Sequence, residues 1–237
     1  MYRKLQRAFL AACLILGPAL LIVSVYLDPD RTVDSNVGSA VIAARMAAGA
    51  TLSPVDLFIM VTELFLLPFG ALGMTLVTLP RSPWLGTVGG FLSISGFVAF
   101  VVFVGQVVQS RLMAQMGGGP QLAALWDRFN TDPVISAYLV VFVAGSLVGP
   151  MLLGIGLHRT GLIPMWANLA LILRVPIQIA GFVSHIGLSI EFVTFGLLLV
   201  GSIPVALTLL RFSDDPTTRS GGFVALALVN KQVPGGQ

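Results

Sequence analysis

Three polar residues, Arg174, Gln178 and His185, interrupt an apolar stretch (171–191) that is long enough to cross a lipid bilayer. At about 100° per residue, their side chains fall within about 40° of one another on one helical face. A cation in the hydrocarbon region of a membrane is costly and is normally paired. We therefore expect this face to point inward, towards acidic residues of other helices.

The acidic residues that could meet this face are Glu63, Asp56 and Glu191. Asp56 and Glu63 are seven residues apart, so they share one face of a helix, with Glu63 about 10 Å deeper. A carboxyl group among apolar side chains holds its proton more strongly and can act as a general acid. We predict that these three acids are the catalytic groups. The sequence leaves open whether Arg174 meets Glu63 or Glu191.

The other polar residues of the apolar runs are predicted to lie in the same half of the bilayer, whereas the opposite half is almost entirely apolar. This asymmetry predicts a polar pocket that opens towards the outer leaflet above an apolar floor. The plainer alternative is that Arg174 and one acid only neutralise each other. The residues predicted to bind a substrate in this pocket are Arg174, Gln178, His185, Tyr138, Gln106 and Trp126.

The residue inventory argues against several other kinds of chemistry. The chain has two histidines, His158 and His185, and one cysteine, Cys13, so we expect no metal site and no internal disulfide. It has no glycine-rich phosphate loop, and we expect no cofactor. The sequence pI is about 9.5, but the basic residues form no patch, so nucleic-acid binding is not expected.

The composition places the chain among integral membrane proteins. It is 56% hydrophobic and 10% charged over 237 residues, whereas soluble domains carry about 25% charged residues. We predict an all-α polytopic membrane helix bundle (1–211), followed by a disordered cytoplasmic tail (212–237). The six predicted transmembrane helices span about 8–27, 54–79, 83–108, 133–157, 162–185 and 188–210.

The distribution of Lys and Arg predicts that both termini are cytoplasmic. The cytoplasmic segments would hold Arg3, Lys4, Arg7, Arg81, Arg159, Arg211, Arg219 and Lys231, and the outer ones Arg31, Arg45, Arg111 and Arg128. The two longer loops, 28–53 and 109–132, would then lie outside. Each contains a short segment predicted to lie on the membrane, and Leu122, Leu125, Trp126 and Phe129 form the apolar face of the second. These segments would act as a lid or only anchor the loops.

Three stretches resemble a group of small, mostly actinobacterial integral membrane proteins with six helices. They are YRKLQRAFLAACLILGPALL, VDLFIMVTELFLLPFGALGMTLVTLPRSPWLGTVGG and YLVVFVAGSLVGPMLLGIGLHRTGLIPMWANLALIL. Some bacterial membrane proteins of this size look like terpene cyclases of secondary metabolism, which cyclise farnesylated indoles or other prenylated aromatics. This resemblance implies an isoprenoid substrate and a location in the bacterial plasma membrane. The acids on which similar fungal cyclases rely would correspond to Glu63 and Glu191.

The leading hypothesis is an intramembrane enzyme for an apolar prenyl or lipid substrate. Glu63 would protonate an alkene or epoxide, Glu191 or Asp56 would take the final proton, and Arg174 would tune the acids. The alternative is a small transporter or a resistance or immunity component, with a relay formed by Glu63 and Arg174. Six helices are few for a transporter, so it would need to form a homodimer or join an ATPase. A third reading is a structural or sensory membrane protein without chemistry.

Overall fold

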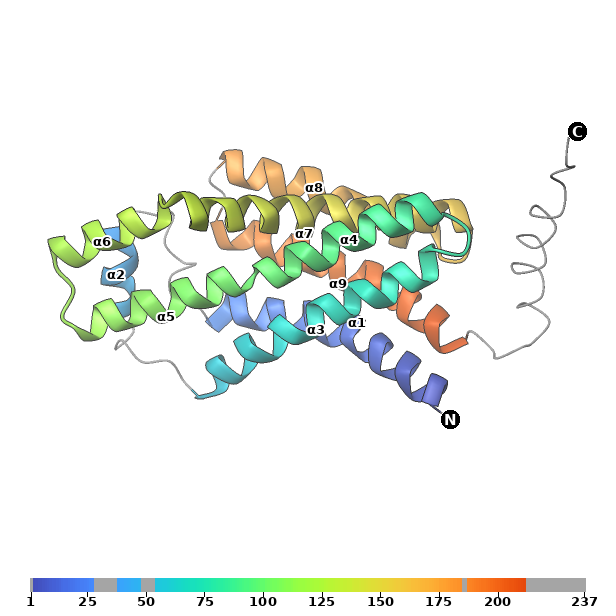
Figure 1. Ribbon diagram of the computed structural model, residues 1–237, viewed down its shortest axis with the longest axis horizontal. Coiled ribbons are helices and arrows are strands. Elements are labelled where there is room, and N and C mark those ends of the chain that lie inside the picture. The colour runs from blue at the N-terminus through green and yellow to red at the C-terminus, as the bar shows by residue number, and fades with distance from the viewer. Residues whose placement is uncertain (1, 28–37, 48–53, 185–186, 212–237) are drawn as a thin grey trace, which may run out of the picture.

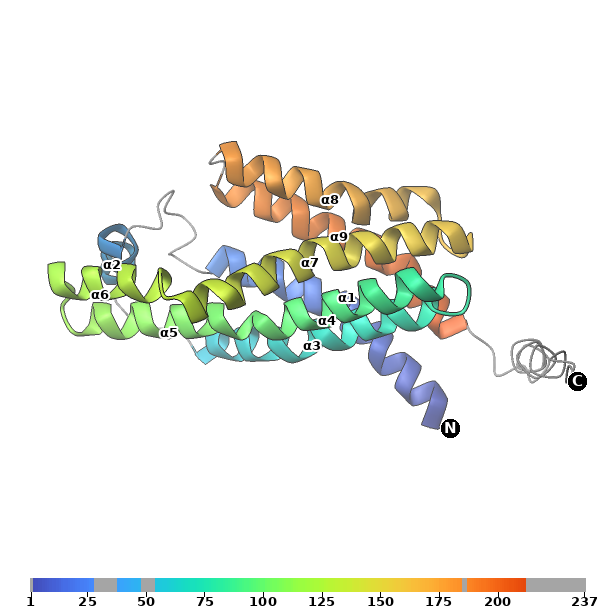
Figure 2. The ribbon, with the colours of Figure 1, turned by 45° about the horizontal axis from the view of Figure 1, so that its top comes forward.

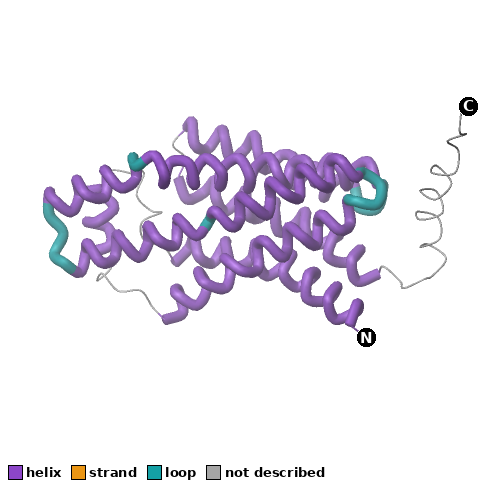
Figure 3. The backbone as a smooth tube through the Cα atoms, viewed as in Figure 1, coloured by secondary structure: helices purple, strands orange, loops and turns teal. Residues whose placement is uncertain are grey.

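The computed structural model describes residues 2–27, 38–47, 54–184 and 187–211. In this part of the chain every regular element is a helix (Figure 3). The helices are α1 (Tyr2–Leu27), α2 (Gly38–Ala47), α3 (Pro54–Thr78), α4 (Pro83–Ala99), α5 (Val101–Gln115), α6 (Pro120–Asn130), α7 (Pro133–Thr160), α8 (Met165–Ser184) and α9 (Gly187–Arg211).

Proline and glycine set several of the helix ends. Pro83, Pro120 and Pro133 occupy the first turn of α4, α6 and α7, where the missing backbone N–H costs no hydrogen bond. At the end of α7, Gly161 has a φ of 63°, a left-handed conformation that glycine adopts without strain. Short turns of this kind explain why α3 and α4, and likewise α7 and α8, form antiparallel pairs.

Five of the helices among the described residues are long and apolar enough to cross a membrane. The prediction of a helical membrane protein is therefore confirmed at this level. Within the described side chains, α8 contributes a shorter apolar segment, Met165–Gly181. Its role as a sixth span and the side on which the termini lie stay predictions. The five long segments are Lys4–Leu27, Val55–Thr78, Pro83–Gln115, Pro133–Thr160 and Ile190–Arg211.

The six longest helices, α1, α3, α4, α7, α8 and α9, form a ring around one apolar core (Figures 1 and 2). Going round the ring, α1 contacts α3, α3 contacts α4, α4 contacts α7, α7 contacts α8, α8 contacts α9 and α9 contacts α1. In addition, α3 contacts α7 and α9 across the bundle, so it is the most central helix. The fully buried side chains of the shared core include Val77, Leu153, Leu157, Leu171 and Val205.

One end of the bundle carries the start of α1, the turns between α3 and α4 and between α7 and α8, and the end of α9 (Figure 1). Lys4, Arg81, Arg159 and Arg211 belong to these segments and thus share this end. The Arg81 guanidinium donates a hydrogen bond to the backbone oxygen of Thr160, which links the two turns. This clustering agrees with the predicted charge bias, although the membrane side that it faces is untested.

At the opposite end, the structure differs from the predicted loops. The predicted span 83–108 is part of a longer helix, because α4 continues through Phe100 into α5 and ends at Gln115. Its 33 residues correspond to about 50 Å of helix, well beyond the roughly 30 Å of the hydrocarbon layer. The end of α5 therefore projects from the bundle. There α2 and α6 pack against it and form a three-helix cap (Figure 1).

The apolar face of α6 packs against protein in this cap. Trp126 is 6% exposed and forms a small core with Val41, Ile42, Met113 and Ala114, whereas Leu125 is 51% exposed. Moreover, α6 runs along the long axis of the molecule and leads directly into α7 (Figure 2). This segment therefore packs on α2 and α5 through Trp126, and its position at the membrane surface stays a prediction.

Replacing Trp126 with alanine is expected to loosen the cap without unfolding the bundle. Truncating a buried aromatic side chain costs about 3–5 kcal/mol, and Trp126 is the largest side chain of this small core. Hydrogen–deuterium exchange should therefore accelerate in α2 and α6 and stay unchanged in α1, α3 and α9. The matched control is Leu125→Ala, one residue away and exposed. Equal exchange in the two variants would contradict the packing described.

Candidate functional site

Glu63 lies in the middle of α3 and is completely buried. It reaches this depth because α3 is the most central helix and packs closely on α1. A Cβ atom on Gly70 would lie 3.2 Å from the backbone oxygen of Cys13, and one on Gly17 3.5 Å from the backbone nitrogen of Leu67. A buried carboxyl group must be protonated, paired or hydrogen-bonded, because burying a bare charge costs several kcal/mol. Glu63 is therefore the strongest candidate for a functional acid.

Two small cavities border the α3 face that carries Glu63. The outer cavity, on the side of the cap, has a volume of about 10 Å³ and includes Ile59 and Met60 of α3. The inner cavity, on the opposite side of Glu63, has a volume of about 20 Å³ and includes Leu67 and Met74. Met60 and Leu67 each lie about one helical turn, or about 5–6 Å, from Glu63 along the axis. Along α3, Glu63 therefore lies between the two cavities, one turn from each, and it lines neither of them.

The outer cavity lies between the bundle and the cap, and residues of opposite charge line it. Arg45 of α2 is 2% exposed, and Asp56 of α3 is half-buried. The predicted placement of Asp56 and Glu63 on one helical face agrees with this geometry, since Asp56 lines the cavity above Glu63. The full lining is Ser24, Leu27, Arg45, Asp56, Ile59, Met60 and Val107.

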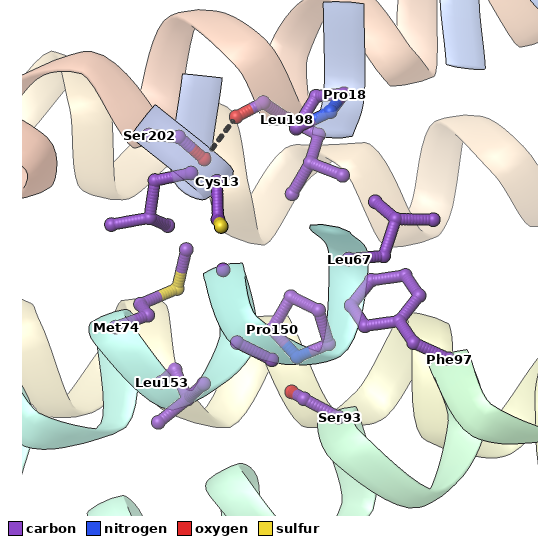
Figure 4. Close-up of a pocket in the computed structure, with 13 residues that line it drawn as sticks. Cys13, Pro18, Leu67, Met74, Ser93, Phe97, Pro150, Leu153, Leu198 and Ser202 are labelled. Atoms are coloured by element: carbon purple, nitrogen blue, oxygen red, sulfur yellow. Dashed lines mark hydrogen bonds between the residues drawn. The ribbon is translucent and has the colours of Figure 1, made fainter. Parts of the chain in front are cut away.

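The inner cavity is mostly apolar and lies between α1, α3, α4, α7 and α9 (Figure 4). Ser93, Cys13 and Ser202 are its most deeply buried groups with sulfur or oxygen functions, at 0%, 1% and 1% exposure. Ser202, which also lines the cavity, donates a hydrogen bond of 2.7 Å to the backbone oxygen of Leu198. Two helix-bending prolines, Pro18 and Pro150, complete the lining at this level.

Arg174 of α8 is 3% exposed and points into the bundle, as predicted. Its Nη1 donates a 3.0 Å hydrogen bond to the backbone oxygen of Ser146 on α7, and its guanidinium lies 5.6 Å from the centre of the Phe195 ring on α9. These contacts stabilise a cation in an apolar environment through a carbonyl dipole and an aromatic face. Neither contact involves Glu63 or Glu191, so the predicted ion pair stays a prediction.

The neighbours of Arg174 on the predicted polar face are only partly described. Gln178 is 5% exposed, and its Oε1 has no hydrogen-bond partner among the described residues. His185 lies outside the described residues. On α9, Glu191 is half-buried, and its backbone oxygen accepts a 3.1 Å hydrogen bond from the fully buried Thr194. The inward orientation predicted for this face therefore holds for Arg174 and Gln178.

The remaining predicted substrate-binding residues lie apart from Glu63. Gln106 donates a 2.5 Å hydrogen bond to Asn130 and so joins α5 to the end of α6. Trp126 belongs to the core of the cap. Tyr138 is 48% exposed on α7. None of these three lines either of the two small cavities along α3, so the large polar pocket stays a prediction.

The sequence reasoning missed Arg45, Ser93 and Cys13 as cavity residues. Arg45 carried a readable signal, because it is the one charged residue within the apolar helix α2. Ser93 and Cys13 carried none, because small polar residues in apolar runs usually serve helix packing. Comparison of the chain with models of protein families, with curated proteins and with solved structures found no match. The resemblance drawn from the sequence therefore stays an expectation.

Proposed function

We propose that the protein is a membrane proton relay in which Glu63 carries the proton. The observation that supports this function best is the position of Glu63, completely buried on α3 one turn from Met60 of one water-sized cavity and one turn from Leu67 of another. Intramembrane ionisable residues of this kind recur in the proton pathways of pumps and transporters. Arg45 and Asp56 form the outer entrance, and the membrane is the plasma membrane of a bacterium.

The cavity sizes favour a proton over a larger solute as the moving species. A cavity needs a volume of about 10–15 Å³, counted as the space open to the centre of a water-sized sphere, to hold one water molecule. The two cavities, at about 10 and 20 Å³, match this requirement. Sites for drug-sized ligands have volumes of roughly 300–1,000 Å³. A proton passes between a carboxyl group and single water molecules without any larger space. In this proposal, Arg174 fixes the electrostatic field around the relay through its contacts with Ser146 and Phe195.

Liposomes that contain the purified protein test this function. A pH gradient is imposed while a potassium ionophore holds the membrane potential constant, and an enclosed pH-sensitive dye reports the internal pH. We expect the gradient to collapse faster than in liposomes prepared without protein, in proportion to the amount of protein inserted. A rate equal to that of empty liposomes at every gradient direction would overturn the proposal.

A second candidate function is the prenyl- or lipid-modifying enzyme, most specifically a membrane-bound terpene cyclase. The observation in its favour is that an apolar cavity lies one turn from a buried carboxylic acid, the pairing that proton-initiated cyclisation requires. The cavity would have to open to several hundred Å³ to admit a farnesyl chain. Pro18 and Pro150, which lie inside α1 and α7, are the positions at which these helices would bend.

Incubation with apolar substrates distinguishes this enzyme from the relay. Membranes containing the protein would receive farnesylated indoles and quinols, with and without a terminal epoxide. Chromatography with mass spectrometry would then search for products of unchanged mass and altered retention. Isomeric products that require Glu63 would establish the enzyme, whereas absence of product together with a protein-dependent proton flux would eliminate it.

A further inference from the structure

The inner cavity contains a polar group that no described residue satisfies. The Ser93 hydroxyl on α4 is completely buried, and its Oγ has no hydrogen-bond partner in the described part of the chain. Figure 4 shows Ser93 across the cavity from Cys13, whose sulfur points into the cavity. An unsatisfied buried hydroxyl costs about 1–3 kcal/mol, so an occupant that hydrogen-bonds to it is favoured.

The size and the lining of the inner cavity determine which kind of molecule it can bind. About 20 Å³ is enough for one water molecule and too little for a lipid chain or an aromatic ring. A buried water needs two to four polar partners, and here Ser93 Oγ, the Cys13 thiol and the oxygen of Ser202 face the same space. A small apolar occupant would leave Ser93 without a partner. A single water molecule therefore fits the cavity best.

We propose that the inner cavity binds one water molecule between Ser93 and Cys13, and that this water accepts the proton of Glu63 when the Glu63 side chain turns inward past Leu67, the first lining residue of the cavity on α3. This inference rests on the proposed function. In the inward step, the Glu63 carboxyl group gives its proton to the water oxygen, and the water releases a different proton towards the inner end. The Glu63 carboxylate then takes a proton from the outer cavity. No other reactant is needed, and each group returns to its starting state.

Buried hydroxyl groups continue from this water towards the inner end. Thr75 of α3 contacts α4 one turn inward of Ser93, because a Cβ atom on Gly90 would lie 2.4 Å from its Oγ1. Thr78 follows one turn later and is completely buried. Each threonine donates to a backbone oxygen of its own helix, at 2.8 and 2.9 Å, which leaves its oxygen free to accept a hydrogen bond. These two hydroxyl oxygens provide polar positions for a proton in the inner half of the bundle, which is otherwise almost entirely apolar.

The single cysteine provides a direct probe of this water. The infrared S–H stretching band of the protein comes from Cys13 alone, and its frequency falls when the thiol forms a hydrogen bond. Transfer of the reconstituted protein into D₂O measures how quickly protons reach Cys13. We expect rapid S–H to S–D exchange in the unmodified protein. An S–H band that persists for hours in D₂O, without exchange to S–D, would overturn the proposal, and this test needs no variant.

The variant Ser93→Ala removes one partner of the water, and Ser110→Ala is the matched control. Ser110 is equally buried, but it lies on α5 and donates to the Val107 oxygen at 3.0 Å. We expect Ser93→Ala to raise the S–H frequency and to slow the proton flux about tenfold, the effect of losing roughly one hydrogen bond from the transfer step. Ser110→Ala should change neither quantity.

The two proposals fail separately. If Ser93→Ala leaves the flux unchanged while Glu63→Gln abolishes it, the relay stands and the water on the inner side is not part of it. If the S–H band responds but the flux does not, the water is present outside the path, which also overturns the inference. If Glu63→Gln leaves the flux intact, the proposed function itself is wrong.

Discussion

Replacing Glu63 with glutamine should lower the protein-dependent proton flux by roughly a hundredfold or more, the lower bound for removing a proton-transferring side chain. Glutamine has nearly the same shape as glutamic acid and keeps its hydrogen-bonding capacity, but it neither takes up nor releases a proton. The substitution also removes a buried ionisable group, so it is not expected to unfold the bundle. The dye-filled liposomes measure the flux, and gel filtration confirms the fold.

Two further variants make this result specific. Glu63→Asp keeps a carboxyl group that is shorter by one methylene, and we expect it to restore part of the flux. Asp132→Asn makes the same change from acid to amide at an exposed position, where the side chain caps α7 through a 2.8 Å hydrogen bond from Val134 N. Asparagine caps a helix as well as aspartate does, so this control should be neutral. Equal flux in Glu63→Gln and Asp132→Asn would exclude Glu63 as the proton carrier.

The helices could be predicted from the sequence because the membrane imposes a minimum length on each apolar run. The predicted spans 54–79, 133–157 and 188–210 correspond closely to α3, α7 and α9. For α7, local residues also mark the ends, because Pro133 begins the helix and Gly161, in the left-handed conformation, follows it. At these ends, the proline or glycine and the length needed to cross the bilayer place the helix boundary at nearly the same residue.

The cap could not be predicted in the same way, because its packing is set by distant residues. The polar residues Gln109 and Arg111 end the apolar run but do not break a helix, and α5 extends to Gln115, where it packs against α2 and α6. The amphipathic face of α6 suits a membrane surface or another helix equally well. The partner of Trp126, α2, lies about 80 residues earlier in the chain, and nothing local marks it.

The candidate site was predictable where helix periodicity alone decides the geometry. The seven-residue spacing places Asp56 and Glu63 on one face, and the cavities lie along that face. The inward position of Arg174 followed from the cost of exposing a cation to lipid. The inner cavity, by contrast, requires the order of helices around the bundle, because Cys13 and Ser93 come from α1 and α4. That order depends on close helix packing, which a hydropathy pattern does not record.

Close packing between α4 and α7 leads to the largest expected effect on stability, that of Gly145→Ala. A Cβ atom at Gly145 would lie 2.4 Å from the backbone oxygen of Leu92 and 2.5 Å from the Cα of Gly96. Both contacts involve backbone, so the helices themselves must separate. Overpacking costs about 1–3 kcal/mol and occasionally more, and we expect the upper end or beyond here. Thermal unfolding in detergent measures the loss.

The control Gly105→Ala separates this steric effect from the general preference of helices for alanine. Gly105 lies in α5, where an added Cβ would meet no atom within 4 Å, so alanine should stabilise the helix by up to about 1 kcal/mol. The two substitutions are chemically identical and should change stability in opposite directions. The seam between α4 and α7 also positions Ser93 and the Ser146 carbonyl that holds Arg174. Gly145→Ala should therefore slow the proton flux even in the molecules that remain folded, whereas equal stability of the two variants would mean that α4 and α7 do not approach this closely.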